Sequence, residues 1–475
     1  MKQECDIGIA GLGVMGRNLM LNLADHNFNV AGFDIDSNKV KSLINEKNPR
    51  LFATSRIEEF VDYLSRPRAV LLLVPAGAPV DSAINNLVDH LQPGDTVIDA
   101  GNSYFRDTDR RAAKLAERRI RFMGTGISGG EDGARNGASI MPGGTEEAWK
   151  RVRPMLEAVA ARVDGAPCAS LLGSGSSGHF VKMVHNGIEY ALMQLIAESY
   201  DLMKRGLGFN DDQLHDIYTE WNQGELNSYL IGITGEIFAV PDEKSGGKLI
   251  NAIRGIARQK GTGMWTSQSA MELQVPIPSI DAAVMMRNLS VFQKERSQIG
   301  MIAGKTVKKF EGKDIPDKLK NALYAAIIIT YSQGMALLAV ASGKYKYSLK
   351  LKEVTRVWKG GCIIRSALLN DIADAFSKSP DLTNLLLDKN ISGKISDRIP
   401  HLREIAGYAS GMGIPVPSMM ASLGWFDAFR SEWSPANLIQ AQRDYFGAHT
   451  YERIDEDGTF HTDWLKLKVH EDISH

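Results

Sequence analysis

The sequence predicts an N-terminal α/β domain (1–176), a large all-α domain (177–433) and a C-terminal tail (434–475). Three observations lead to this division. Short apolar runs alternate with amphipathic segments in the first part, which is typical of βαβ units around a parallel sheet. The glycine- and serine-rich stretch Leu171–His179 then interrupts that pattern. Beyond it the apolar residues recur with a period of about 3.6, and Pro435 breaks the last helix of this kind.

Strands of the first domain are expected in its short apolar runs. The runs are DIGIAGLG, NVAGFD, AVLLLVPA, DTVIDAGN and IRFMGTGI. The segments between them carry the spacing of amphipathic helices. The order of elements therefore predicts successive βαβ units and a parallel sheet.

The second domain contains the longest apolar tract of the chain, Ala322–Ala341. Its length alone would allow it to cross a membrane. Tyr331, Ser332 and Gln333 stand in its middle, so we expect a buried core helix instead.

A weak internal repeat indicates that the all-α domain consists of two similar halves. The segment HNGIEYALMQLIAESYDLM precedes Trp221, Gly224, Ser228 and Leu230, and KNALYAAIIITYSQGMALL precedes Trp358, Gly361, Ser366 and Leu368. When Asn186 is aligned with Asn321, three polar residues of the first copy have different counterparts in the second. Lys182, His185 and Glu189 correspond to Asp317, Lys320 and Tyr324. The first copy therefore carries polar residues that the helix does not require for folding.

Composition excludes several function classes. A formal net charge of −1 over 475 residues provides no global field to hold nucleic acid or an anionic membrane. The N-terminus enters a strand-like run without the pattern of a signal peptide. Cys5, Cys168 and Cys362 are widely spaced and form no metal or disulfide pattern. We expect a cytoplasmic, enzyme-sized protein without a metal site.

The GLGVMG motif predicts a dinucleotide site. Gly11, Gly13 and Gly16 have the spacing G-x-G-x-x-G, and the motif follows a strand and opens a helix. In that context the glycines let the backbone approach a pyrophosphate at the helix N-terminus. The loop residues Leu12, Val14 and Met15 complete the predicted cofactor contact. The alternative is a tight turn that binds nothing.

Asp34 ends the second predicted strand, where a carboxylate can bind the adenosine ribose hydroxyls of NAD. The 2′-phosphate of NADP would lie close to it. Two like charges about 4 Å apart repel by roughly 4 kcal/mol at an effective dielectric constant near 20. Asp36 adds a second negative charge, unless it serves only as the N-cap of the next helix, and no arginine follows to offset these charges.

A polar stripe begins the first helix of the all-α domain. Its members are Lys182, His185, Asn186, Glu189 and Tyr190, at the i, i+3, i+4, i+7 and i+8 positions of one helix face. The apolar sequence that follows predicts a buried helix, so the stripe indicates a binding cleft. Near the helix N-terminus the dipole would lower the pKa of Lys182, as a lysine base requires. Alternatively, the Lys–Glu pair is solvated or structural, and His185 is a satisfied core histidine.

Several long strings resemble one family, the 6-phosphogluconate dehydrogenases. They are GLGVMG, GNSYFRDT, GTGISGGEDGARNGASIMPGG, KMVHNGIEY, EWNQGELNSYLI, KGTGMWTSQSA, GGCIIRS and ANLIQAQRDYFGAHTY. The resemblance covers essentially the whole chain. It implies a Rossmann-type domain, a helical domain and a tail that reaches the partner subunit of a homodimer. It also implies oxidative decarboxylation of 6-phospho-D-gluconate to D-ribulose 5-phosphate and CO2, with reduction of a nicotinamide cofactor.

The resemblance also implies a role for each matching residue. Lys182 matches the general base that accepts the C3 hydroxyl proton, and Glu189 matches the acid that protonates C1 of the enediol that remains after CO2 leaves. The implied substrate ligands are Asn102, Ser128, Gly129, Gly130, His185, Asn186, Tyr190, Lys260 and Arg287, together with Arg443 and His449 from the partner's tail. Ser128–Gly130 follow the strand GTGI, where N–H groups can bind a carboxylate, although a plain turn would look the same. The implied cofactor contacts beyond GLGVMG are Asp34, Ile35, Asp36, Val74, Pro75, Ala76 and Asn102.

The chain departs from the family pattern at the adenosine end of the cofactor site. The family commonly has Asn-Arg-Thr or Asn-Arg-Ser where this chain has Asp34-Ile35-Asp36, and often lysine where it has Pro75. Both changes remove positive charge. We therefore expect NAD to be preferred over NADP.

Two other functions are compatible with part of the pattern. A β-hydroxyacid dehydrogenase that acts on another small acid would share GxGxxG and the catalytic lysine, but such enzymes lack the second helical half and the tail. A non-catalytic dinucleotide-sensing protein would be expected to lose Lys182 or Glu189, and both are present.

Overall fold

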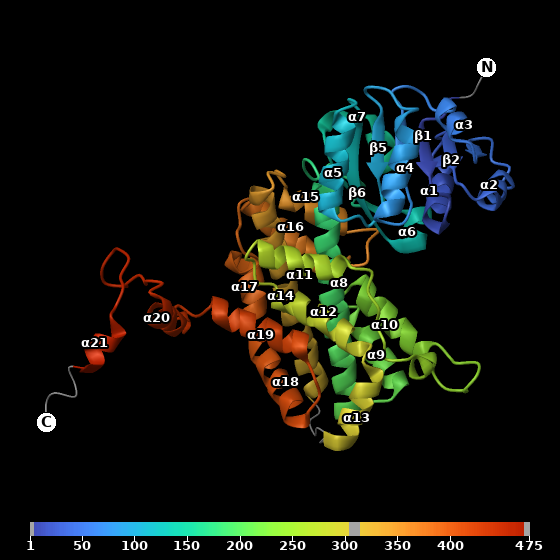
Figure 1. The fold of residues 1–475 in the computed structure, drawn as a ribbon. Helices are drawn as coiled ribbons and strands as arrows, with labels where there is room; N and C mark the ends of the chain where they lie inside the picture. The colour runs from blue at the N-terminus through green and yellow to red at the C-terminus, as the bar shows by residue number, and fades with distance from the viewer. Residues whose placement is uncertain (1–3, 304–313, 470–475) are drawn as a thin grey trace, which may run out of the picture. The chain divides into compact units, whose positions relative to one another are not determined.

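The N-terminal domain is built on a seven-stranded sheet, in a computed structural model that describes residues 4–303 and 314–469. The strand order is β3-β2-β1-β4-β5-β6-β7 (Figure 1). The strands are β1 (Ile7–Ala10), β2 (Val30–Phe33), β3 (Leu51–Thr54), β4 (Ala69–Leu72), β5 (Thr96–Asp99), β6 (Arg121–Ser128) and β7 (Ser139–Gly143). All neighbouring pairs are parallel except β6 with β7. The predicted parallel sheet is thus confirmed.

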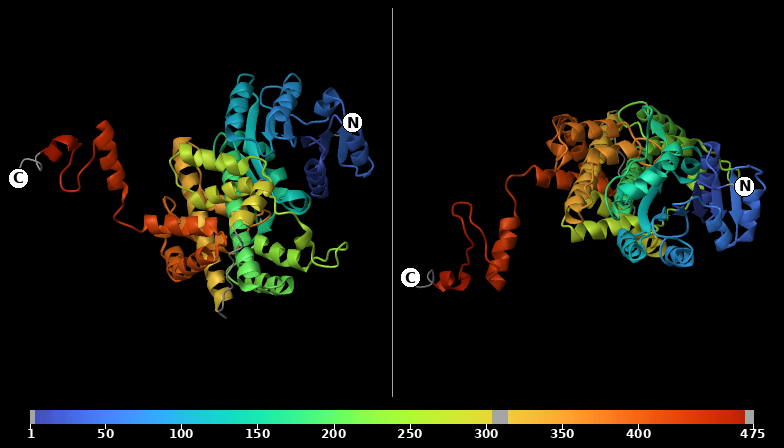
Figure 2. Two further views of the ribbon diagram at one scale, coloured as in Figure 1. Left: turned by 60° about the horizontal axis from the view of Figure 1, so that its bottom comes forward. Right: turned by 90° about the horizontal axis from the view of Figure 1, so that it is seen from above.

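Helices cover both faces of this sheet (Figure 2). They are α1 (Val14–Asp25), α2 (Ser37–Ile44), α3 (Ile57–Asp62), α4 (Ala78–Val88), α5 (Phe105–Ala116), α6 (Gly130–Asn136) and α7 (Glu146–Ala158). Side chains alternate along β4, so that Leu71 packs into the core with α1 and α7. Its neighbours Val70 and Leu72 pack with α3 and α4 on the other face. Burial on both faces explains why the strands read as continuous apolar runs.

Two strands of the seven-stranded sheet were missed by the sequence analysis. β3 is a short edge strand whose residues are mostly half-buried, so it lacks a long apolar run. β7 contains Pro142, which the sequence alone marks as unfavourable for a strand, and β7 lies at the opposite edge. A short hairpin, β8 (Arg162–Val163) with β9 (Ala166–Pro167), precedes the second domain.

The remainder of the chain is helical, as predicted. Its α-helices are α8 (Ser177–Asp201), α9 (Asp211–Trp221), α10 (Tyr229–Ala239), α11 (Thr262–Glu272), α12 (Pro278–Ser290), α13 (Gln293–Ala303), α14 (Ile315–Lys344), α15 (Leu351–Trp358), α16 (Leu368–Lys378), α17 (Lys389–Ser396), α18 (Ile399–Met412), α19 (Pro417–Phe429), α20 (Ala436–Gly447) and α21 (Trp464–Val469). A π-helical turn, η1 (Leu202–Leu207), extends α8, and two 3-10 turns are η2 (Leu249–Ala252) and η3 (Leu385–Leu387). Helix α8 packs on β6 and β7 as well as on α11, α12 and α14, so it links the sheet to the helical layers (Figure 1).

Helix α14 contains the apolar tract that sequence length alone would allow in a membrane. It is the one helix of the described residues that is long and apolar enough to span a bilayer, and 83% of its most apolar window is buried inside the protein. It packs against α8 and α18. The interpretation as a core helix is therefore confirmed.

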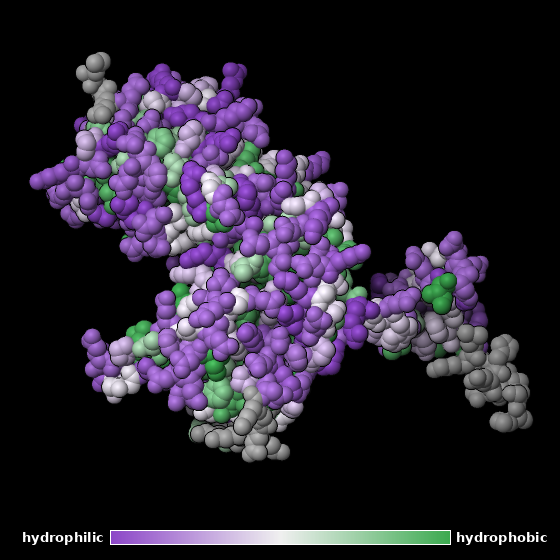
Figure 3. Space-filling model, turned by 180° about the vertical axis from the view of Figure 1, so that it is seen from behind, coloured by the Kyte–Doolittle hydropathy of each residue, from purple (hydrophilic) through white to green (hydrophobic). Residues whose placement is uncertain are grey.

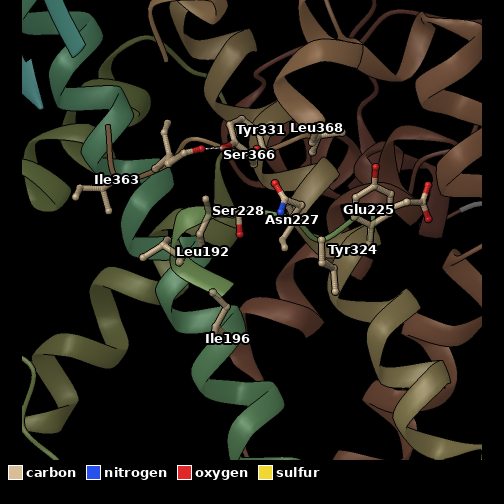
Figure 4. Close-up of a pocket in the computed structure, with 14 residues that line it drawn as sticks. Leu192, Ile196, Glu225, Asn227, Ser228, Tyr324, Tyr331, Ile363, Ser366 and Leu368 are labelled. Carbon is tan, nitrogen blue, oxygen red and sulfur yellow. Dashed lines mark hydrogen bonds between the residues drawn. The ribbon is translucent and has the colours of Figure 1, made fainter. Parts of the chain in front are cut away.

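The two helical halves meet around equivalent residues. Trp221 ends α9 and Trp358 ends α15, and a serine follows each at a similar distance. These serines, Ser228 and Ser366, pair with each other in a short antiparallel bridge. Beside it lies a mostly apolar cavity with room of about 20 Å³, enough for about one water molecule (Figure 4). The Tyr331 hydroxyl donates a hydrogen bond of 2.7 Å to the Ile364 carbonyl at this cavity.

The described chain divides into two compact units, with the second beginning at Gly424 inside α19. In the second unit, Tyr451 pairs with Phe460 through backbone hydrogen bonds, and Trp464 packs against Tyr445 and Tyr451. Several aromatic side chains of the tail thus pack against one another within the tail. Phe446 remains 73% exposed.

Candidate functional site

The first candidate site is a cavity of about 610 Å³ at the carboxyl ends of β1, β2 and β4. Its lining includes Gly11, Gly13, Val14, Met15, Gly16, Asp34, Ile35, Val74 and Pro75, which the sequence analysis had assigned to the cofactor. Leu12 is buried beneath the loop, and Asp36 and Ala76 are absent from the lining of this cavity. The GLGVMG turn thus lies at the wall of a cavity.

Glycine is required by the geometry of this turn. A Cβ on Gly16 would lie 1.9 Å from the Gly11 carbonyl oxygen, so only glycine allows α1 to start so close to β1. Gly11 has φ 103°, and a Cβ there would lie 2.4 Å from the Leu73 carbonyl oxygen. Around Gly13 no atom lies within 4 Å of a Cβ position, so its backbone is open to the cavity. No side chain caps α1 and its first turn has no acidic residue, which leaves its N–H groups available to a phosphate. The residues present fit a dinucleotide.

Asp34 directly follows β2, and its carboxylate accepts three hydrogen bonds within the protein. Its Oδ1 accepts a hydrogen bond from Asp36 N, and its Oδ2 accepts bonds from Leu12 N and Lys39 Nζ. Burial raises the pKa of Asp34, but these hydrogen bonds outweigh burial and hold the pKa below its usual value. The carboxylate is ionised at neutral pH, and Leu12 N joins it to the glycine-rich loop.

Two structural details bear on the charge of this region. Asp36 is the N-cap of α2, where its side chain accepts a hydrogen bond from Asn38 N, as the alternative interpretation had it. No arginine follows Asp34 closely, as expected, but a lysine that the sequence analysis did not consider offsets its charge. Lys39, in the first turn of α2, forms an ion pair with Asp34 at 3.2 Å, and its side chain is 44% exposed. It also lines the cavity. The sequence analysis considered only an arginine close to Asp34 as a possible counter-charge, so it missed Lys39.

A second cavity, of about 810 Å³, adjoins the first. The two share the lining residues Met15, Leu73, Val74 and Pro75. The second cavity is lined by Ala76 and Asn102 on the Rossmann side, and by Asn186, Glu189, Tyr190, Lys260 and Arg287 on the helical side. A ligand in the first cavity can therefore extend to the polar residues of α8.

The polar stripe of α8 does not face bulk water. Lys182 is 6% exposed, and His185, Asn186 and Tyr190 are also buried, while Glu189 is half-buried. The stem of Lys182 lies against Gly126 of β6, where an added Cβ would come 2.3 Å from Lys182 Cβ. The stripe therefore lies between the sheet and the helical layers, as a cleft requires.

Burial perturbs the titration of the stripe. Burial lowers the pKa of Lys182 and raises the pKa of Glu189. The helix begins at Ser177, so Lys182 is in its second turn and not in its first. The expected effect of the helix dipole on Lys182 is thus smaller than predicted, and burial is the main cause. Both shifts favour the neutral forms, an amine that can accept a proton and a carboxylic acid that can donate one.

His185 connects the helix to the loop after β6. Its Nε2 lies 3.4 Å from Ser128 Oγ, its Nδ1 lies 3.1 Å from Asn186 Oδ1, and Glu189 Oε2 is 3.8 Å from the same Nδ1. Burial and the charge of Lys182 lower the pKa of His185 well below its usual value, so the imidazole is neutral. A neutral imidazole can donate to or accept from a hydroxyl.

Ser128, Gly129 and Gly130 join β6 to α6. Gly129 has φ 120° and Gly130 has φ 62°. A Cβ on Gly129 would lie 2.5 Å from the Gly361 carbonyl oxygen, so this loop packs directly on the GGCIIRS segment of the second helical half. The predicted contact of these three residues with a substrate carboxylate stays a prediction.

Asn102 is exposed at the cavity and belongs to a loop anchored by a buried carboxylate. Asp99, at the end of β5, accepts hydrogen bonds from Gly101 N, Ser103 Oγ and Arg111 Nη1. These bonds flank Asn102 on both sides and hold the loop against the sheet. The sequence analysis identified Asn102 but not the residues that hold its loop.

Three cations gather at the second cavity. Arg287 stacks on Tyr190 with its Cζ 3.4 Å from the ring centroid. Lys260 is a second lining residue of this cavity. The third, Arg258, was missed, although it stands two residues before Lys260. Trp265 also lines this cavity and packs at a tilt against Tyr104, with the ring centroids 5.0 Å apart. With Glu189 as the one acidic residue of the lining, the cavity favours an anion.

Two predicted ligands are not part of the unit that contains these cavities. Arg443 and His449 belong to the second unit of the chain, and their place in the site stays a prediction. Within residues 4–303 and 314–469, no group of three or more His, Cys, Asp or Glu residues could hold a metal ion.

Known proteins similar to this chain cover almost all of it. Residues 6–172 match the model of the NAD binding domain of 6-phosphogluconate dehydrogenase, and residues 178–464 match its C-terminal domain. A relative from Bacillus subtilis, named 6-phosphogluconate dehydrogenase, NADP(+)-dependent, decarboxylating, is 47% identical over 97% of this chain and 99% of its own length. A decarboxylating 6-phosphogluconate dehydrogenase from Synechocystis is 48% identical over 96% of this chain and 97% of its own length.

The fold agrees with a solved structure of the same kind. The 6-phosphogluconate dehydrogenase of Plasmodium falciparum, studied in apo form and with NADP+ and 6-phosphogluconate, superposes with a TM-score of 0.94. It is 41% identical, and the match covers 97% of this chain and 100% of that one. The chain therefore belongs to the 6-phosphogluconate dehydrogenase family of decarboxylating, NAD(P)-dependent oxidoreductases.

Proposed function

We propose that this chain oxidises and decarboxylates 6-phospho-D-gluconate to D-ribulose 5-phosphate and CO2, with NAD as the preferred cofactor. The observation that carries the proposal is the face of α8. Lys182 and Glu189 lie on one buried helix face, with pKa shifts of opposite direction, beside a cavity lined by three cations. A sugar acid with a carboxylate and a phosphate has the charge and the length that such a site accommodates.

Lys182 acts as the base. Its neutral amine accepts the proton of the C3 hydroxyl while the C3 hydrogen leaves as hydride. The nicotinamide cofactor supplies the acceptor for that hydride. The resulting ammonium then stabilises negative charge on the C3 oxygen as the C1–C2 bond breaks and CO2 leaves. Burial supports this role, because it lowers the pKa of Lys182 and keeps the amine neutral before the reaction.

Glu189 acts as the acid. After loss of CO2 the electron pair of the broken bond lies in an enediol, and C2 of the substrate, which becomes C1 of ribulose 5-phosphate, requires a proton. A protonated Glu189 can supply it, and burial raises the pKa of this residue as the role demands. Seven residues of helix separate Lys182 from Glu189, an axial rise of about 10 Å, so two long side chains can reach neighbouring carbons of one substrate.

The other polar groups bind and orient the substrate. Ser128, Gly129 and Gly130 bind the C1 carboxylate, and Asn102, His185 and Asn186 bind hydroxyl groups. Tyr190, Lys260 and Arg287 bind the 6-phosphate, and Arg258 adds positive charge to the same cavity. In this scheme Arg287 already has its guanidinium stacked on Tyr190, so its orientation is set before the substrate arrives.

The preference for NAD rests on Asp34. Its carboxylate has three of about four lone-pair positions occupied by Asp36 N, Leu12 N and Lys39 Nζ, which leaves about one acceptor position for a ribose hydroxyl. A 2′-phosphate brings no proton to donate and adds negative charge beside an ionised carboxylate. The relatives named above include NADP-dependent proteins, so this preference is specific to the residues of this chain.

The double variant Asp34→Asn with Ile35→Arg tests this preference. We expect the ratio of kcat/KM for NADP to that for NAD to rise by about 10²-fold, because a repulsive charge is removed and a cation is added. The wild-type ratio is measured first. A wild-type ratio that favours NADP would contradict the proposed preference and would leave the assignment of the reaction untouched.

Lys39 is expected to moderate the same preference. Because Lys39 partly neutralises Asp34, the variant Lys39→Met should weaken NADP binding by about tenfold and change NAD binding by less than about threefold. Dissociation constants for both cofactors measured by calorimetry decide this. Lys41→Met, which removes another exposed lysine of α2, is the matched control and should alter neither constant.

The tail and the oligomer belong to the same proposal. We expect a cytoplasmic homodimer in which the tail of each subunit supplies Arg443 and His449 to the site of its partner. Large apolar residues exposed on the helical domain support an interface there (Figure 3). They include Met285, Leu289, Phe292, Ile299, Met301 and Ile302. A monomer should then be inactive.

One assay separates the candidate functions. Purified protein is mixed with 6-phosphogluconate and NAD or NADP, and both the reduced cofactor and released CO2 are measured. Equal amounts of both products are expected. Reduction without CO2 would favour a β-hydroxyacid dehydrogenase, and cofactor binding without reduction would favour a sensing protein.

A further inference from the structure

The tail unit is organised around one buried carboxylate. Asp444, on α20, is 0% exposed. Its oxygens accept hydrogen bonds from Thr450 N, Thr462 N and Trp464 Nε1, and His461 Nδ1 lies 2.8 Å away. A buried charge is costly unless such partners surround it. Asp444 therefore connects α20 to Thr450, just after the helix, and to the later segment 461–464.

The backbone beside Asp444 is strained. Ala448 has φ 47° and Thr450 has φ 61°, so two residues that are not glycine adopt the left-handed conformation on either side of His449. Such conformations persist only where neighbouring contacts hold them. Thr450 is held on both sides, because its N–H donates to Asp444 and its carbonyl accepts from Gln440 Nε2.

The same contacts orient the two basic side chains. Arg443 Nη1 donates to Gln440 Oε1 at 2.9 Å, so Gln440 bridges Arg443 and Thr450. The ring of His449 lies against Gly447, where an added Cβ would come 2.8 Å from the imidazole. Both basic side chains are exposed, and neither forms an ion pair within residues 424–469.

We propose that Asp444 and Gln440 are positioning residues that preform Arg443 and His449 as a binding pair for a phosphate monoester. The inference rests on the proposed function, in which these two basic residues bind the 6-phosphate of the substrate. Preforming the pair removes the ordering cost that a flexible tail would otherwise incur on binding. Asp444 and Gln440 themselves do not contact the substrate.

The variant Asp444→Asn in the full-length protein tests the proposal. It replaces one acceptor oxygen by a donor and removes the charge, so the strained segment loses its anchor. We expect KM for 6-phosphogluconate to rise about tenfold, with KM for the cofactor unchanged and kcat reduced less than about threefold. Asp455→Asn is the matched control, because Asp455 is an exposed carboxylate of the same unit paired only with Arg453 in the described structure. It should leave every constant unchanged.

A double-mutant cycle separates positioning from a general loss of folding. If Asp444 acts through His449, Asp444→Asn should add little to the effect of His449→Ala on substrate KM. Effects that multiply would overturn the proposal, as would an unchanged KM in Asp444→Asn. An unchanged KM in His449→Ala would instead contradict the proposed role of the tail, so the two failures are distinguishable.

Gln440→Leu provides a second variant should Asp444→Asn fail to fold. It leaves the buried carboxylate and its four partners in place and removes only the bridge between Thr450 and Arg443. We expect substrate KM to rise about fivefold and the oligomeric state in light scattering to match the wild type. No rise in substrate KM for a folded Gln440→Leu protein would overturn the role of Gln440.

Discussion

Lys182→Met should lower kcat by about 10³-fold to 10⁴-fold, because the variant removes the base from the site and leaves a side chain of similar length. The reaction cannot begin without an acceptor for the C3 hydroxyl proton, and no second lysine lines the inner part of the stripe between β6 and α8 in the described structure. Binding of 6-phosphogluconate, measured by calorimetry, should change by less than about tenfold.

Two further variants identify the chemistry. Lys182→Arg keeps the positive charge, but a guanidinium cannot lose a proton in a protein, so kcat should be as low as in Lys182→Met. Lys320→Met is the matched control, since Lys320 lies on α14, the counterpart of α8 in the second helical half. It should be fully active. Substantial activity in Lys182→Arg would show that charge, and not proton transfer, is the contribution of this residue.

The pH dependence gives an independent check on the base. Burial lowers the pKa of Lys182 from its ordinary value, and the amine must be neutral to act. Activity should therefore be present above that pKa and fall as the pH decreases through it. Because Lys182 and Glu189 interact, the fitted values belong to the pair and not to either residue alone.

The main elements of the sheet could be predicted because burial on both faces gives an unambiguous signal. Every predicted run has an apolar centre, and the five runs coincide with β1, β2, β4, β5 and β6. The edge strands β3 and β7 gave no such signal. β3 is mostly half-buried, and β7, although buried, contains Pro142, which a strand tolerates at an edge. The central strands of a parallel sheet are therefore easier to predict from the sequence than its edge strands.

The candidate site could be predicted from spacing, but its electrostatics could not. Positions along one helix determine which side chains share a face, so the α8 stripe was visible in the sequence. The pairing of Lys39 with Asp34 depends instead on how α2 turns back over the end of β2. Likewise, the start of α8 at Ser177 moves Lys182 away from the helix end, and this boundary has no capping side chain to mark it.

Glu189→Gln should lower kcat by about 10²-fold to 10³-fold, because it removes the acid and retains the shape of the side chain. The same variant should slow the exchange of the C1 hydrogens of ribulose 5-phosphate with deuterated solvent, measured by proton NMR. That exchange passes through the enediol and requires neither hydride transfer nor CO2. A normal exchange rate in Glu189→Gln would exclude Glu189 as the acid.

The Glu189→Gln variant should also change how kcat depends on pH at the alkaline end. Burial raises the pKa of Glu189, so the acid form persists to higher pH than in an exposed glutamate. In the wild type, activity that depends on the acid is present below this pKa and is lost as the pH rises through it. Glutamine does not titrate, so the alkaline fall in kcat should disappear while the acidic fall caused by Lys182 remains. Glu220→Gln, which alters an exposed carboxylate of α9 that pairs with Lys320 of α14, should keep both the acidic and the alkaline fall in kcat.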